Sequence, residues 1–196
     1  MAELIEIRWH GRGGQGAKTA ATFLAAAAIK EGKYSQGFPE YGPERMGAPM
    51  KGFTRISEEP IKLHCAIYTP DVVIVLDPTL LDVVDVGEGL KEDGVIIVNS
   101  PKPPAEIRKK LEHSGSFVSD GRKIYTVDAT KIALDELGRA IPNTPMIGAL
   151  TKVKELISLD VIVEDIREKF AAKFSEKVIE GNVKAIKRAY QEVRGE

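Results

Sequence analysis

The stretch I-E-I-R-W-H-G-R-G-G-Q-G-A-K, residues 5–18, decides the fold of this chain. Its apolar beginning is typical of a buried strand, residues 10–16 form a glycine-rich turn, and Ala17 opens an alanine-rich helix. The spacing G-x-G-x-x-G is met by Gly11, Gly13 and Gly16. Glycines allow a tight turn and a close approach to a ligand, and the start of a helix attracts anions. The stretch therefore predicts a strand–loop–helix unit with an anion-binding loop, whose ligand is left open.

The candidate binding residues of this loop are Gly11, Arg12, Gly13, Gly14, Gln15, Gly16 and Lys18. A lysine in the first helical turn is unfavourable for the bare helix dipole, which hints at an anion nearby. A nicotinamide site would need an acidic residue about 20 positions further on, at the end of the second strand. Glu31 instead falls in the helix and Glu40 stands late, so a classical NAD enzyme is disfavoured. A glycine turn that serves only close packing stays open.

Strands and helices alternate through the rest of the sequence. Strands are expected at residues 33–38, 50–56, 61–67, 72–76, 94–99, 116–119 and 123–127, with hairpins joining 50–56 to 61–67 and 116–119 to 123–127. Helices are expected at residues 17–30, 78–86, 105–112 and 129–139, with Asp77 and Asp128 as the caps of the second and the fourth. A further helix is expected from Pro145 with Thr144 as its cap, and two amphipathic segments follow. This order predicts a three-layer, Rossmann-like α/β fold with a mainly parallel sheet in residues 1–142. A helical C-terminal extension, residues 143–196, completes a single domain.

Composition and charge exclude several classes of protein. A formal net charge of -1 argues against a nucleic-acid binder that works by bulk electrostatics. The single cysteine, Cys65, excludes an internal disulfide and any iron–sulfur or structural zinc cluster built from this chain alone, and we expect it to be a small buried hydrophobe. No signal peptide or membrane-spanning stretch is recognised, which predicts a cytoplasmic soluble protein. No catalytic residue or metal ligand is predicted, and His64 beside Cys65 is interpreted as structural, because adjacent strand residues face opposite sides.

A second stretch, F-P-E-Y-G-P-E-R-M-G-A-P at residues 38–49, marks a loop with an unusually rich mixture of side chains. Loops held by a rigid scaffold are where function concentrates. The turn before Pro145 is the other polar connection of this kind. The candidate interface or cleft residues are Glu40, Tyr41, Arg45, Met46, Asn143 and Thr144.

Four blocks of the chain together resemble the gamma chains of the 2-oxoacid:acceptor oxidoreductase family, in particular those of its pyruvate:ferredoxin oxidoreductases. The blocks are residues 7–18, 38–49, 70–77 and 141–150, and the resemblance spans residues 5–190. Within the second block, residues 45–49 are more similar to the pyruvate and branched-chain 2-oxoacid members than to the 2-oxoglutarate members.

The resemblance implies a gamma subunit of a multi-subunit enzyme that oxidatively decarboxylates a 2-oxoacid, pyruvate first, to acyl-CoA, carbon dioxide and reduced ferredoxin. It implies alpha, beta and delta-type partner subunits, which hold thiamine diphosphate, magnesium and the 4Fe-4S clusters. Branched-chain 2-oxoacids and 2-oxoglutarate remain alternative substrates. A non-catalytic nucleotide-binding or regulatory module remains an alternative of another class. Neither nucleic acid nor a membrane is an expected partner.

The glycine loop has two interpretations under this resemblance. In the first, Arg12 and Lys18 hold part of the phosphate charge of coenzyme A. In the second, the loop docks on the backbone of a neighbouring subunit. The sequence leaves both open.

Overall fold

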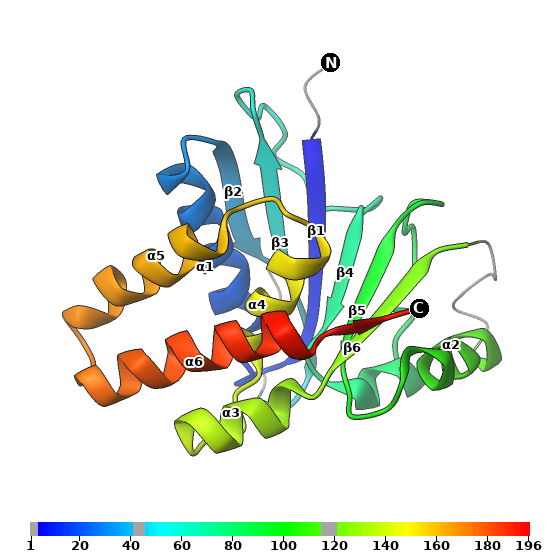
Figure 1. Cartoon of the computed structure of the whole chain (residues 1–196). Helices are drawn as coiled ribbons and strands as arrows, with labels where there is room; N and C mark the ends of the chain where they lie inside the picture. Colours follow the sequence, from blue (N-terminus) through cyan, green and yellow to red (C-terminus); the bar gives the residue numbers. More distant parts are fainter. Residues whose placement is uncertain (1–3, 41–45, 115–120) are drawn as a thin grey trace.

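The computed structural model describes residues 4–40, 46–114 and 121–196, and this part of the chain forms one seven-stranded sheet (Figure 1). The strands are β1 (Leu4–Arg12), β2 (Tyr34–Pro39), β3 (Pro49–Ser57), β4 (Val72–Val75), β5 (Val95–Asn99), β6 (Lys123–Val127) and β7 (Arg194–Gly195), in the order β2-β3-β1-β4-β5-β6-β7. β1, β4, β5 and β6 pair in parallel, β3 pairs antiparallel with β1 and β2, and β7 pairs antiparallel with β6. All described strands except β3 and β7 therefore point the same way, which confirms a mainly parallel sheet.

Helices cover both faces of this sheet, as the three-layer prediction requires. One face carries α1 (Ala17–Lys30), α3 (Ala129–Leu137), α4 (Asn143–Val153), α5 (Leu159–Ala171) and α6 (Glu176–Glu192), and the other carries the 3-10 helix η1 (Pro78–Asp82) and α2 (Pro104–His113) (Figure 1). Successive strand residues point to opposite faces, so the central strands supply both cores. Val72 and Ile74 pack under the five-helix layer, while Val73 and Val75 pack under η1 and α2.

α1 lies unusually close to the sheet because small residues meet on both sides of the contact. A Cβ added to Gly37 on β2 would stand 2.8 Å from the carbonyl oxygen of Ala21, and one added to Gly52 on β3 would stand 3.0 Å from that of Ala17. Thr54 on β3 donates a hydrogen bond of 2.9 Å to the same Ala21 oxygen. The alanine-rich helix and the strand glycines therefore fix the height of α1 above the sheet.

The C-terminal helices join the same layer by a second close approach. A Cβ added to Gly148 on α4 would stand 2.2 Å from the carbonyl oxygen of Ile186 on α6. After α6 the chain returns to the sheet as β7, a strand that the sequence did not predict. There Arg108 of α2 contacts the carboxylate of Glu196, which holds the end of the chain against the opposite layer.

The predicted strand at residues 61–67, and with it the hairpin to residues 50–56, is wrong. Both edges of β3 are already filled, by β1 and by β2, so no edge is left for a hairpin partner. The segment instead lies against side chains of the sheet. Gln36 donates from Nε2 to the carbonyl oxygen of Leu63 at 2.9 Å, and the buried Arg55 donates from Nη2 to that of Ala66 at 3.3 Å.

Cys65 lies on this segment and is exposed, so the expectation of a buried hydrophobe is wrong. Its Sγ accepts a hydrogen bond of 3.7 Å from Nη2 of Arg55. His64 is exposed as well. Because the segment is not a strand, the argument that placed the two side chains on opposite faces no longer applies.

Three smaller expectations concern helix ends and one hairpin. The helix expected at residues 78–86 is the shorter η1, in which Asp77 is the cap as predicted and Val83 donates to Leu80 at the three-residue spacing. α4 begins at Asn143 with Pro142 as its cap, two residues before the predicted start, so Thr144 is not the cap. The strand expected at 116–119 lies outside the described residues.

We predict that Gly148→Ala destabilises the chain. Alanine favours a helix interior over glycine by about 1 kcal/mol, whereas overpacking a tight contact costs about 1–3 kcal/mol. Here the added methyl group meets a backbone oxygen, which cannot rotate away, so the loss should exceed the gain. Thermal and urea unfolding measure the difference. The matched control is Lys184→Ala on the exposed side of α6, which should change stability by less than about 0.5 kcal/mol. A stabilised Gly148→Ala variant would contradict the packing.

Candidate functional site

The glycine loop lies where the order of the sheet reverses. From β1 the chain crosses to β2 on one side, and after β3 it returns to β4 on the other side of β1. In open α/β sheets, ligands bind at the carboxyl ends of the strands beside such a switch point. The residue after β4, Leu76, donates its N–H to the carbonyl oxygen of His10 at 2.8 Å, which brings the end of β4 against the loop.

The loop itself is shorter than the sequence predicted. β1 continues through Arg12, with Gly11 paired to Met50 and Arg12 to Pro49, so the first glycine of the motif belongs to a strand and not to the turn. Gly14 and Gly16 make the turn, with φ of 96° and 82°, in the left-handed region that favours glycine. Gly14 is exposed and faces open space.

Gly16 caps α1 and is also the point at which the C-terminal helices reach the loop. A Cβ added there would stand 2.4 Å from Nδ2 of Asn143. The side-chain oxygen of Asn143 is occupied by the N–H of Thr144 at 2.8 Å. Asn143 therefore lies at the loop, whereas Thr144 is buried behind it.

The loop is also tied to the end of the proline-rich segment. Gly13 donates to the carbonyl oxygen of Ala48 at 3.0 Å, and Gly47 donates back to that of Gly13 at 3.2 Å. Next to this bridge, Met46 is 95% exposed. The two stretches thus meet at Gly13 and Gly47, a contact that the sequence did not predict. Tyr41 and Arg45, also predicted as interface or cleft residues, lie outside the described residues.

Glu40 does not reach the loop through any described contact. It follows β2, which is separated from β1 by β3. Its exposed carboxylate lies 3.8 Å from Nζ of Lys51, and its N–H donates to the carbonyl oxygen of the same lysine at 2.9 Å. Of the predicted interface residues that the structure describes, Asn143 and Met46 are thus placed at the loop and Glu40 is not.

Arg12 and Gln15 are held by a residue that the sequence identified only as a helix cap, Asp77. Nε of Arg12 lies 3.2 Å from Oδ2 of Asp77, and Nε2 of Gln15 donates to the same oxygen at 2.7 Å. Arg12 also donates from Nη2 to Oγ1 of Thr79 at 2.9 Å and from Nη1 to the carbonyl oxygen of Gly47 at 3.1 Å. The Arg12 charge is therefore partly neutralised within the chain.

Lys18 is the basic residue of the loop that no described contact restrains. Its side chain is exposed in the first turn of α1, and no ion pair or hydrogen bond joins it to the described residues. The first N–H groups of a helix lack partners within the helix, so they add donors beside this lysine. Lys18 and these N–H groups can bind an anion together. Lys18 is therefore a stronger candidate for an anion ligand than Arg12.

His10, near the end of β1, is a neutral structural group. It is 2% exposed, and its Nε2 accepts a hydrogen bond of 3.0 Å from Nε of Arg8. Burial, followed by the charges of Arg8 and Lys51, lowers the pKa of His10 to about 3. Near neutral pH this imidazole is therefore uncharged and cannot act as a general acid.

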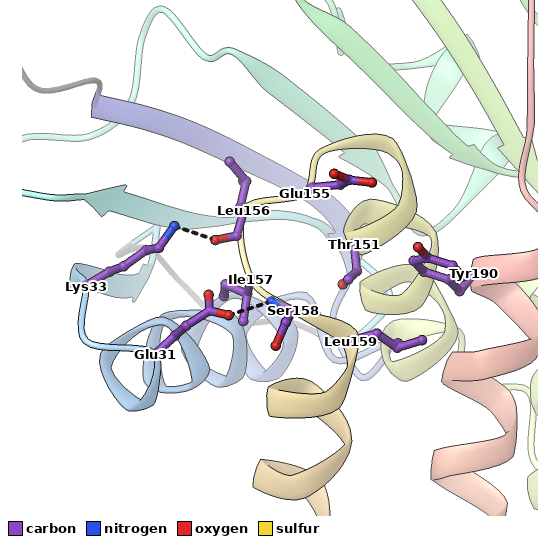
Figure 2. A pocket seen from close by; sticks show the side chains of 9 residues that line it. All are labelled: Glu31, Lys33, Thr151, Glu155, Leu156, Ile157, Ser158, Leu159 and Tyr190. Carbon is purple, nitrogen blue, oxygen red and sulfur yellow. Dashed lines mark hydrogen bonds between the residues drawn. The ribbon is translucent and has the colours of Figure 1, made fainter.

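A cavity of about 430 Å³ opens at the other end of α1 (Figure 2). The α1–β2 turn, the α4–α5 connection and Tyr190 of α6 line it. Its walls are joined by hydrogen bonds of 2.8 Å, from the N–H of Ser158 to Glu31 and from Nζ of Lys33 to the carbonyl oxygen of Leu156 (Figure 2). These charged groups already have partners, so we assign the cavity no ligand.

The described residues contain no cluster of three or more histidine, cysteine, aspartate or glutamate side chains able to hold a metal ion. Over the same residues, no helix combines the length and apolar character needed to cross a membrane.

Comparison with known proteins gives consistent matches over nearly the whole chain. A family model described as pyruvate ferredoxin/flavodoxin oxidoreductase matches residues 6–192. Pyruvate synthase subunit PorC of Thermotoga maritima is 51% identical over 97% of this chain and 95% of its own. The pyruvate/ketoisovalerate oxidoreductases common subunit gamma of Thermococcus kodakarensis is 50% identical over 95% and 96%. The crystal structure of the Thermotoga maritima subunit is similar with a TM-score of 0.85 and 47% identity, over 98% of both chains.

We predict that acid weakens the fold partly through His10. Between pH 6.5, where the unfolded imidazole titrates, and about pH 3, the unfolded chain binds a proton that the folded chain does not. Stability therefore falls as pH falls through this window, by up to about 1.4 kcal/mol per pH unit from this group. His10→Gln, which retains an acceptor for Arg8, should show a shallower loss of stability from pH 6.5 to 4 in urea titrations. The exposed His64→Gln serves as control and should follow the wild type. Equal slopes for His10→Gln and wild type would refute the role of His10.

Proposed function

The chain belongs to the pyruvate ferredoxin/flavodoxin oxidoreductase family, and we propose from this that it works as the gamma subunit of a multi-subunit 2-oxoacid:ferredoxin oxidoreductase in the cytoplasm. The observation that carries the proposal is the identity of 51% with a pyruvate synthase subunit, which extends over 97% of the chain. The complex oxidatively decarboxylates a 2-oxoacid with coenzyme A, giving acyl-CoA, carbon dioxide and reduced ferredoxin.

Pyruvate is the substrate that we propose first. One relative is named as a subunit of pyruvate synthase, and another of nearly equal identity is named as a subunit common to pyruvate and ketoisovalerate oxidoreductases. A subunit that is shared by a pyruvate and a ketoisovalerate oxidoreductase does not by itself select between the side chains of the two substrates. Substrate choice therefore depends on the partner subunits, and branched-chain 2-oxoacids are the second candidate.

The alpha, beta and delta-type partners hold the redox and thiamine groups. A 4Fe-4S cluster takes four thiolates, and this chain has a single cysteine. The side chains present do not fit such a cluster, and the sequence lacks the Gly-Asp-Gly motif of thiamine sites. Thiamine diphosphate, when bound in a partner, stabilises the carbanion left by loss of carbon dioxide.

Within this complex we propose that the glycine loop handles coenzyme A. Three features support the loop as an anion site: its place at the switch point, the exposed Lys18, and the donors at the start of α1. Arg12 is the weaker partner for a phosphate, because Asp77 already faces its guanidinium. Docking of the loop on a partner backbone is the competing interpretation.

We predict that Lys18→Ala in the assembled enzyme raises the KM for coenzyme A. Loss of one charge-assisted contact is worth about 1.5–3 kcal/mol, which corresponds to about tenfold or more in affinity. Arg12→Ala should have the smaller effect, and Lys184→Ala, an exposed lysine on α6, is the control and should have none. Steady-state kinetics over a range of coenzyme A concentrations measures this. Unchanged coenzyme A kinetics would refute the assignment, and loss of the complex on gel filtration would favour docking.

We further predict that the chain co-purifies with partner subunits as a brown, iron-containing complex. Its activity with ferredoxin as acceptor should be highest with pyruvate in a panel of 2-oxoacids. Highest activity with a branched-chain 2-oxoacid would move the assignment to the second candidate. A colourless, stable monomer that binds a nucleotide would overturn the oxidoreductase role.

A further inference from the structure

Asp77 connects the glycine loop to two other parts of the chain. Its Oδ2 accepts from Gln15 and faces Arg12, while its Oδ1 accepts from the N–H and the hydroxyl of Thr79 at 2.9 and 2.7 Å. Gln15 in turn accepts the backbone N–H of Arg12 with Oε1 at 2.8 Å, which fixes the orientation of its amide. Arg12 extends the connection to the carbonyl oxygen of Gly47. One carboxylate therefore joins the end of β4, the turn after β1 and residues 46–48.

The charge of this carboxylate is maintained although its side chain is only 13% exposed. Burial raises its pKa, but the hydrogen bonds from Thr79 and Gln15 and the charge of Arg12 outweigh burial, so the pKa lies below the ordinary value. Every hydrogen bond described at its two oxygens is donated by Thr79 or Gln15, and Arg12 faces the pair on Oδ2. Such a carboxylate is engaged in holding its neighbours and is not presented to a ligand.

We propose that Asp77 is the positioning residue of the glycine loop. It holds Arg12 and Gln15 so that the turn at Gly13–Gly16 and the Gly47 bridge form one rigid surface before the ligand arrives. A ligand then binds without first ordering the loop, which removes an entropic cost from binding. The consequence for coenzyme A rests on the function proposed above, whereas the rigidity of the loop does not.

The test is Asp77→Asn in the assembled complex. In asparagine an NH2 group replaces one of the two carboxylate oxygens. If it replaces Oδ2, it faces the donors of Gln15 and Arg12, and if it replaces Oδ1, it faces the N–H of Thr79. In either orientation one donor therefore meets another. Asp82→Asn is the matched control, because Asp82 lies at the end of the same short helix and its ion pair of 2.8 Å with Lys110 is remote from the loop. Hydrogen exchange followed by mass spectrometry reports on peptides covering residues 13–19 and 46–51. Steady-state kinetics reports KM for coenzyme A separately from kcat.

Asp77→Asn should accelerate exchange in both peptides. It should raise KM for coenzyme A by about tenfold, with kcat within about twofold, because the ligand must then order the side chains of Arg12 and Gln15 on binding. Gln15→Ala combined with Asp77→Asn should be no worse than Asp77→Asn alone, because the two side chains act as one unit. Asp82→Asn should match the wild type in every measurement.

Unchanged exchange in Asp77→Asn, or effects that add in the double variant, would overturn the positioning role. Faster exchange with unchanged KM would support the positioning role and overturn the assignment of coenzyme A to this loop. A fall in kcat with unchanged KM and unchanged exchange would show that Asp77 acts on the reaction and not on the loop, and so would also overturn the proposal.

Discussion

The close approach of α1 to β2 and β3 is the constraint on which the rest of the structure depends. A Cβ at Gly37 would clash with the backbone of α1, and one at Gly52 would crowd it. Thr54 adds a hydrogen bond to the helix carbonyl of Ala21, so the helix has one height above the sheet. A helix held at both its middle and its beginning cannot slide. The packing of α1 therefore fixes the position of the turn between β1 and α1. Gly14 and Gly16 only allow the backbone conformation that this turn requires.

The C-terminal helices complete the same arrangement from the far side of α1. Gly148 lets α4 press against α6, and the first residue of α4, Asn143, reaches Gly16. The loop is thus shaped by residues separated by more than a hundred positions. A substitution in the helical extension can reach the candidate site by this route, since α4 cannot shift without moving Asn143.

The sequence predicted the elements whose signals are local and missed those decided by long-range packing. Runs of apolar residues gave the central strands, and Asp77, Asp128 and the glycines marked turns and helix ends that the structure has. Residues 61–67 look like a strand, but β1 and β2 occupy both edges of β3, which no local pattern reveals. The contact of Asp77 with Arg12 was hidden for the same reason, because 65 positions separate them. The sequence indicated this contact only in that Asp77 is a polar residue directly after a buried strand.

The polar groups around the loop are arranged for binding and not for moving protons. His10 is buried and neutral, with Arg8 donating to its Nε2. Asp77 is charged, and the hydrogen bonds of Thr79 and Gln15 occupy both of its oxygens. A general acid or base must exchange its proton near neutral pH and reach the reacting atom, and neither group meets both conditions. What the loop offers instead is a fixed surface with one unrestrained lysine beside a helix start. Within the oxidoreductase proposed above, such a loop would contribute orientation and charge to a reaction centre, and partner subunits would supply the reactive groups.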